Sequence, residues 1–225
     1  MKNLSNAKSR RAFIGKLAAG TAVGLTSLTA LKNPAAVMGA KRGADAENWF
    51  KNAKGKHRIV YDASEPHEGL PFIWSWVFYT TNNETGVADG DMTAMVVLRH
   101  NAIPFALEDR VWKKYNLGEV FKVTDNTTKK PALRNPYYNP GAGDFPFPAI
   151  EGIQKMQTRG AMFCVCNMAL KVYSGVVAQA ANLNPDEVYQ DWKAGVLKDI
   201  EIVPSGVWAV GRAQEHGFGY CYAGG

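Results

Sequence analysis

Residues 161–182 read AMFCVCNMALKVYSGVVAQAAN, and this stretch decides the fold class. Its first five residues form a short apolar run that favours a buried strand, and the segment from Met168 to Asn182 is typical of a helix. A buried strand that leads directly into a helix is one unit of a parallel sheet, because parallel strands need a crossover connection. The stretch therefore predicts an α/β domain.

The same alternation recurs along most of the chain. Strands are expected at His57–Asp62, Met92–Leu98, Ala161–Val165, Ile200–Val203 and Phe218–Tyr222. Helices are expected at Pro71–Thr81, Asp109–Phe121, Phe147–Thr158, Met168–Asn182, Pro185–Ala194 and Gly206–His216. Short apolar strands that alternate with helices predict a mostly parallel five-stranded sheet with helices on both faces.

Residues 125–148 break this regular pattern. They hold five of the eleven prolines, together with Arg134, Tyr137 and Tyr138. A long stretch of this kind in a compact domain is usually a lid, a subunit arm or a disordered segment. Tyrosine, arginine and locally stiff proline favour a lid or an arm.

The first 46 residues are typical of an export signal. A basic segment carries Arg10 and Arg11 within the sequence SRRAFIGK (residues 9–16), and residues 17–31 are uncharged and mildly apolar. That run is too short to cross a membrane, for which about 20 strongly apolar residues are needed. Cleavage sites end at Ala40 and at Ala46, and the second is preferred. We therefore expect export by the twin-arginine (Tat) translocase to the periplasm, with a membrane anchor formed by an uncleaved leader as the alternative.

The leader also explains the basic charge of the chain. The whole sequence has 26 Lys and Arg residues against 20 Asp and Glu residues, a net charge of +6. Residues 1–46 hold eight basic residues and one acidic residue, so residues 47–225 keep 18 against 19, a net charge of −1. A mature chain of this charge gives no support for nucleic acid or an acidic membrane as a partner. Its 179 residues suit a single domain.

The ends of the strands select the candidate functional residues. In an open parallel sheet, sites form beyond the carboxyl ends of the strands. Cys166 follows the third strand at the start of a helix, where the helix dipole and backbone N–H groups favour a thiolate. Cys164 lies deeper on the same side of the strand and is expected in the core. Cys221 is expected to be a packing residue, with a disulfide to one of the other two cysteines left open.

Several other polar residues are expected at or near this edge. His100 either deprotonates Cys166 or binds an anion, or it is a solvent-facing residue at the end of a strand. Asn101 and Asn167 are neighbours of the same edge, and His67 lies in a loop between acidic residues. Ser205 is expected to cap the last helix, whose N-terminus suits an anion.

No motif for nucleotide binding, serine hydrolysis or zinc proteolysis is present. Cys-x-Cys is not a usual metal-ligand spacing. We therefore expect no cofactor and no metal.

Three stretches resemble the DsrE/DsrF-like family. They are GAMFCVCNMALK (160–171), DIEIVPSGVWAV (199–210) and RAQEHGFGY (212–220), with RIVYD (58–62) and VVLRHN (96–101) similar to the first two strands of that family. The resemblance spans roughly residues 57–222 with a gap at the proline-rich segment. It implies a three-layer flavodoxin-like fold and assembly into trimers or hexamers.

The same resemblance implies a function. Members with a role in sulfur relay use a cysteine as a persulfide carrier, and by position that role falls on Cys166. The chain is therefore expected to be an exported sulfur carrier whose partners are small sulfur species. The alternative is a non-catalytic oligomeric module of the periplasm that binds a ligand or has a structural role.

Overall fold

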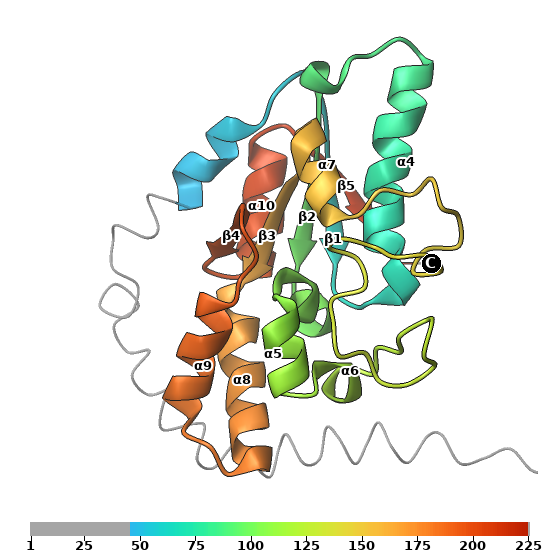
Figure 1. Ribbon diagram of the computed structural model, residues 1–225. Helices are drawn as coiled ribbons and strands as arrows, with labels where there is room; N and C mark the ends of the chain where they lie inside the picture. The colour runs from blue at the N-terminus through green and yellow to red at the C-terminus, as the bar shows by residue number, and fades with distance from the viewer. Residues whose placement is uncertain (1–45, 225) are drawn as a thin grey trace, which may run out of the picture. The chain divides into compact units, whose positions relative to one another are not determined.

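The computed structural model describes residues 46–224 of the chain. The predicted leader, with Arg10, Arg11 and Ala40, lies outside these residues except for Ala46, its last residue. Within them, a five-stranded sheet forms the centre of the domain (Figure 1). Its strands are β1 (His57–Ala63), β2 (Met92–Leu98), β3 (Met162–Cys166), β4 (Ile200–Val203) and β5 (Gly219–Tyr222).

All neighbouring strands of the sheet are parallel, in the order β4-β3-β2-β1-β5. The chain moves one strand at a time from β1 to β4 and then returns to add β5 on the far side of β1. Because crossovers between parallel strands are right-handed, the first three connections place their helices on one face. The reversed last connection places its helix on the other face. The predicted three-layer, flavodoxin-like α/β class is confirmed.

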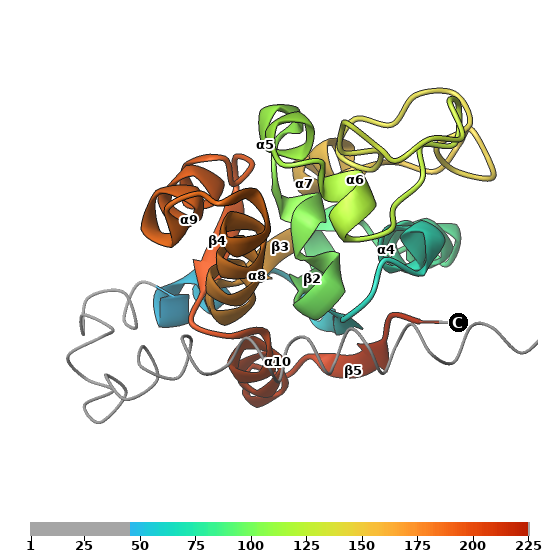
Figure 2. The same ribbon diagram turned by 90° about the horizontal axis from the view of Figure 1, so that it is seen from below.

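The first face carries most of the helices (Figure 2). They are α4 (Leu70–Glu84), α5 (Asp109–Lys114), α6 (Leu117–Val120), α7 (Ile153–Arg159), α8 (Asn167–Ala181) and α9 (Pro185–Ala194). The opposite face is covered by α10 (Gly206–Glu215) and by residues around Phe50. Four 3-10 turns complete the described elements: η2 (Phe50–Asn52), η3 (His67–Gly69), η4 (Asp89–Asp91) and η5 (His100–Ala106).

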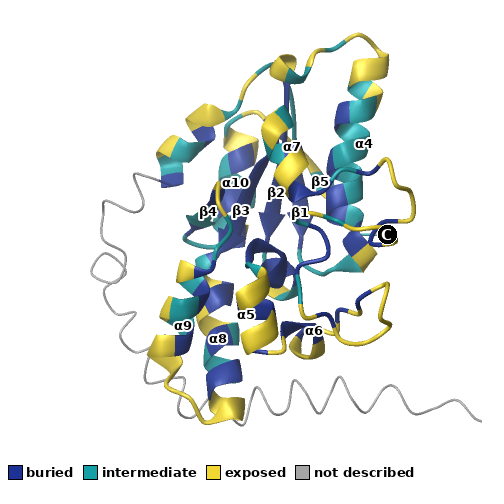
Figure 3. Ribbon diagram, viewed as in Figure 1, coloured by how far each residue is buried: buried dark blue, intermediate teal, exposed yellow. Residues whose placement is uncertain are grey.

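The core is divided by the sheet into two unequal clusters. Alternate residues of β2 supply both, because side chains along a strand point to opposite faces: Ala94 and Val96 join the larger cluster, Met95 and Val97 the smaller. Every residue of β2 is buried, as Figure 3 shows for the centre of the sheet. The smaller cluster lies against α10 and contains Cys164, so the expectation that Cys164 is a core residue is confirmed.

Two helix predictions are wrong in part. The helix expected over 109–121 is divided into α5 and α6, since Asn116 adopts a left-handed conformation (φ 49°) that asparagine tolerates. The helix expected from Phe147 begins only at Ile153. Gly152 precedes it, and a Cβ there would lie 2.3 Å from Pro140, so the proline-rich segment packs against the start of α7.

The structure differs most from the sequence prediction at the proline-rich segment, residues 125–148. Seven of residues 125–148 are buried and anchor the segment to the core, while 14 of the 24 are exposed. The ring of Tyr137 lies among Phe72, Phe105 and Phe145, with ring centroids 5.0–5.1 Å apart. Asn135 is buried and donates to the carbonyl oxygens of Phe105 (2.8 Å) and Leu107 (3.2 Å).

Ion pairing also holds this segment in place. Arg134 forms two hydrogen bonds to the buried carboxylate of Asp144, at 2.7 and 2.8 Å, and contacts Asp125 at 3.1 Å. Backbone N–H groups of Thr128 and Thr127 donate to Asp125 and, with Arg134, lower the pKa of this carboxyl group. Buried aromatic and ionic contacts of this kind are not visible in proline content, which is why a lid or an arm was expected.

Candidate functional site

Cys166 ends β3 and is also the N-cap of α8. Its side chain is 7% exposed, and Sγ accepts a hydrogen bond from the backbone N–H of Ala169 at 3.3 Å. A sulfur atom that accepts an N–H bond at the start of a 15-residue helix lies where the helix dipole favours a negative charge. The predicted position of this thiol at a helix N-terminus is therefore confirmed.

A partly buried ion pair lies at the same edge of the sheet. Asp62 of β1 is 5% exposed, and both of its carboxylate oxygens accept hydrogen bonds from Arg99, at 2.6 Å from Nε and 2.9 Å from Nη2. Tyr220 of β5 adds a third hydrogen bond to Asp62 at 3.1 Å. Such a bidentate pair fixes the guanidinium plane.

Arg99 connects this ion pair to Cys166. The hydrogen bond to Asp62 raises the pKa of Arg99, and the charges of Asp62, Tyr220 and Cys166 raise it further. Arg99 and Cys166 directly follow Leu98 and Val165, which are register partners on the neighbouring strands β2 and β3. The aliphatic part of Arg99 lies against the first turn of α10, since a Cβ on Gly206 would be 2.5 Å from the Arg99 Cβ. A thiol, an arginine and two helix N-termini thus converge at this edge.

Ser205 caps α10, as expected. Its Oγ accepts the backbone N–H of Trp208 at 3.2 Å, and it stands two residues beyond Val203, the strand partner of Cys166. This cap therefore lies near the cysteine end of β3.

His100 is bonded within a separate network. Its Nδ1 lies 3.0 Å from Glu65, which also accepts two hydrogen bonds from Asn101 at 2.9 and 3.1 Å. Asn101 in turn accepts a hydrogen bond from Tyr173 at 2.8 Å. The structure therefore pairs His100 and Asn101 with Glu65, where the sequence had suggested His100 as a base for Cys166.

The side chains of the remaining predicted neighbours are bonded to other residues. Asn167 accepts a hydrogen bond from the hydroxyl of Tyr189 at 2.6 Å, which ties α8 to α9. His67 Nε2 lies 3.0 Å from the hydroxyl of Tyr222 on β5, which is separated from β3 by the two strands β2 and β1. Asn167 and His67 therefore have structural partners of their own.

Sequence reasoning did not predict the pairing of Asp62 with Arg99 or the part played by Tyr220. A usable signal was present: a carboxylate at the end of an otherwise apolar strand needs a partner when it is buried. The approach of Tyr220 depends on β5 lying beside β1, which the order of elements along the chain does not reveal.

The three thiols are free in the structure. Cys164 is 0% exposed, and burial raises the pKa of its thiol well above the ordinary value, with smaller contributions from Cys166 and Glu201. Among residues 46–224, no group of three or more His, Cys, Asp or Glu side chains has the arrangement of a metal site. Nor does that part of the chain contain a helix of the length and apolarity that crossing a membrane requires.

Comparison with known proteins assigns the chain to no family. No protein-family model matches the chain, and no curated protein matches it. Among solved structures, the chain is similar to a protein of unknown function from Methanobacterium thermoautotrophicum, with 16% sequence identity and a TM-score of 0.37. That similarity covers 74% of this chain and 98% of the archaeal one.

Proposed function

We propose that the chain is a sulfur carrier in which Cys166 holds a sulfane sulfur as a persulfide. The observation that carries the proposal is the position of the thiol. Its sulfur accepts a backbone N–H at the start of α8, and Arg99 follows Leu98 on the neighbouring strand, at the register position beside Cys166. A persulfide is an anion at the pH of most compartments, so it benefits from the same two groups as the thiolate.

The transfer step is a displacement at sulfur. The Cys166 thiolate attacks the sulfane sulfur of a donor such as thiosulfate, a new S–S bond forms, and the old bond to sulfite breaks. Sulfite leaves with the electron pair, and the persulfide anion remains on the protein. Delivery is the same reaction with a thiolate acceptor. Since Cys166 is largely buried, small inorganic donors are the expected substrates.

Mass spectrometry tests this function. After incubation with thiosulfate or polysulfide, the intact protein is expected to gain about 32 Da, one sulfur atom, and to lose it on treatment with dithiothreitol. Cys166→Ser is expected to abolish the gain, whereas Cys221→Ser, the control at a partly exposed thiol, keeps it. A protein that forms no adduct with any donor, or an adduct that survives in Cys166→Ser, contradicts the proposal.

We also propose that the carrier works in the periplasm after export through the twin-arginine translocase, as a homo-oligomer. The twin arginines and the neutral run of the leader support export. Replacement of Arg10 and Arg11 by lysine is expected to leave the protein in the cytoplasmic fraction, and an unchanged distribution would refute export by this route. Static light scattering measures the assembly.

A second candidate is a non-catalytic binding or structural module. It is favoured by apolar and aromatic side chains exposed beside the edge strand, of which Val207, Tyr220 and Tyr222 are about half or more exposed. Such side chains are typical of contact surfaces when they are contiguous. In this case, Cys166→Ser leaves both the assembly and any ligand binding intact, and no sulfur adduct forms on the wild type.

A further inference from the structure

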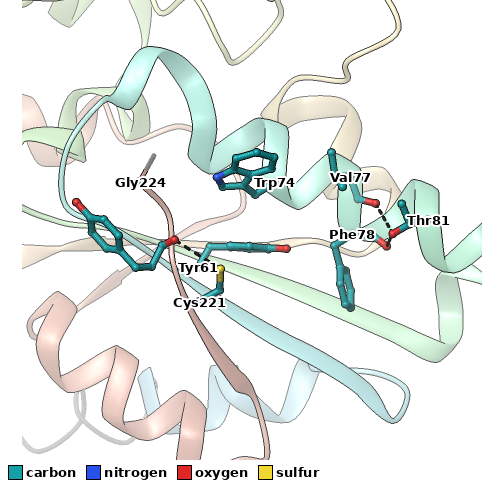
Figure 4. Close-up of a pocket in the computed structure, with 8 residues that line it drawn as sticks. Tyr61, Trp74, Val77, Phe78, Thr81, Cys221 and Gly224 are labelled. Carbon is teal, nitrogen blue, oxygen red and sulfur yellow. Dashed lines mark hydrogen bonds between the residues drawn. The ribbon is translucent and has the colours of Figure 1, made fainter.

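The smaller core cluster includes a short segment from the start of the described chain. This segment, residues 46–52, is called the strap; it forms one helical turn followed by η2 and lies beside α10 in Figure 1. The larger face of the sheet is covered by helices that follow β1. On that face Trp74 and Phe78 of α4 line a pocket with Tyr61 (Figure 4). The smaller face is covered by α10, and the strap adds further apolar side chains to this cover.

Phe50 attaches the strap to the core. It is 2% exposed and belongs to the cluster that contains Val97 and Cys164. Its ring is stacked on His216, with centroids 5.1 Å apart and planes 3° from parallel, and it lies edge-on to Trp208 at 5.8 Å. Release of the strap would therefore uncover apolar side chains of the sheet and of α10.

Ionic contacts hold the start of the strap. The carboxylate of Glu47 lies 3.3 Å from Nε of Arg212 and 3.2 Å from Nε2 of His216, at the end of α10. Ala46, the residue before it, is 2% exposed. The peptide bond between Ala46 and Glu47 therefore lies at the start of a docked helical turn. Proteases act on exposed, locally unfolded chain, so this bond is cleaved only when the strap is released.

We propose that the strap shields the Ala46–Glu47 bond from the processing protease, so that the leader is removed after Ala40 and residues 41–46 stay on the mature protein. The inference rests on the proposed export, because the twin-arginine route carries proteins that have already folded. The strap is then docked before the protease meets the chain. The mature protein begins at Lys41 and has 20 basic against 20 acidic residues, a net charge of 0.

The N-terminus of the exported protein tests this assignment. Protein recovered from the periplasmic fraction is expected to begin at Lys41, as read by intact mass and peptide mapping. A chain that begins at Glu47 would overturn the inference and leave the proposed export intact. A full-length chain would overturn processing after Ala40, and its confinement to the cytoplasmic fraction would also refute the export.

Elastase tests the shielding itself, whether or not the chain is exported and whether or not Cys166 carries sulfur. The enzyme cleaves after alanine, so the purified full chain and a synthetic peptide of residues 41–52 present the same bond after Ala46. Mass spectrometry of the fragments follows this cleavage. We expect it to be at least about 100-fold slower in the native chain, because proteolysis tracks the population of the open form. Equal rates would overturn the inference.

Three variants make the test specific. Phe50→Asn removes the stacked ring, so cleavage after Ala46 is expected to approach the rate of the peptide. Arg212→Gln removes a contact of Glu47 from the side of α10 and leaves the cleaved sequence unchanged. It is expected to raise the rate about threefold, even if Phe50→Asn is poorly folded. Lys51→Gln, at an exposed position of the strap, is the matched control and is expected to change nothing. Identical rates in the wild type, Phe50→Asn and Arg212→Gln would contradict the role of the strap.

Discussion

Replacing Asn135 by alanine tests whether the proline-rich segment is part of the folded core. Asn135 is 4% exposed; its Nδ2 donates to the carbonyl oxygens of Phe105 and Leu107, and its Oδ1 accepts the backbone N–H of Tyr137 at 3.1 Å. In Asn135→Ala the Leu107 carbonyl keeps the indole N–H of Trp112 at 3.2 Å. The Phe105 carbonyl oxygen and the Tyr137 N–H lose their hydrogen bonds to the Asn135 side chain.

The size of the effect is set by these two buried polar groups, which lose their hydrogen-bond partner. Each costs about 1–3 kcal/mol, so we expect the free energy of unfolding to fall by about 3 kcal/mol. For a domain of this size, that loss lowers the melting temperature by about 6–12 °C. Urea unfolding followed by tryptophan fluorescence measures the first quantity, and calorimetry measures the second.

Asn126→Ala is the matched control in the same segment. Asn126 is exposed and donates one hydrogen bond, to the carbonyl oxygen of Asp144 at 3.1 Å, so its loss is expected to cost no more than about 1 kcal/mol. A change below about 0.5 kcal/mol for Asn135→Ala would refute the reasoning. It would mean that the segment opens independently, as a lid does.

Three further predictions concern stability and reactivity. Gly206→Ala places a Cβ 2.5 Å from the Cβ of Arg99, so we expect the free energy of unfolding in urea to fall by about 1–3 kcal/mol. Gly211 lies in open space on the same helix, and Gly211→Ala is expected to raise that free energy by about 0.5–1 kcal/mol. Equal effects of the two substitutions would contradict the packing argument. Asp125 has a folded-state pKa below its unfolded value, so its contribution is complete above about pH 5 and is lost as the pH falls through the folded pKa. Asp125→Asn should therefore flatten the loss of stability below about pH 4, and a parallel curve would count against it. Cys164 should resist iodoacetamide at pH 8 in the folded protein and react after unfolding, and rapid labelling of the native protein would show that the sheet opens there.

Local patterns predicted the regular part of the fold well. The boundaries of β2, β4 and α9 agree with those expected from the sequence, because each is a short run with a clear signal at both ends. In α9, Asn184 caps the first turn, accepting the N–H groups of Asp186 and Glu187, directly before Pro185. Such signals act within one turn of the chain, so they can be read without the rest of the molecule.

Contacts between distant segments were not predictable in the same way. The packing of Tyr137 on Phe72 joins residues 65 positions apart, and no local pattern marks it. The candidate site also combines local features, which could be predicted, with contacts between distant segments, which could not. The helix-cap position of Cys166 follows from a strand that runs into a helix, whereas the pairing of Asp62 with Arg99 and Tyr220 depends on the order of strands in the sheet.

The return of β5 to the side of β1 has a consequence for synthesis of the chain. Tyr61 pairs with Cys221, which leaves the ribosome about 160 residues later. Until then β1 has one unpaired edge, and unpaired strand edges recruit other chains. The sheet is therefore completed only after β5 has left the ribosome. A protein that lacked residues 219–222 would keep every other strand and still present an open edge, with Tyr61 uncovered, to its neighbours in the cell.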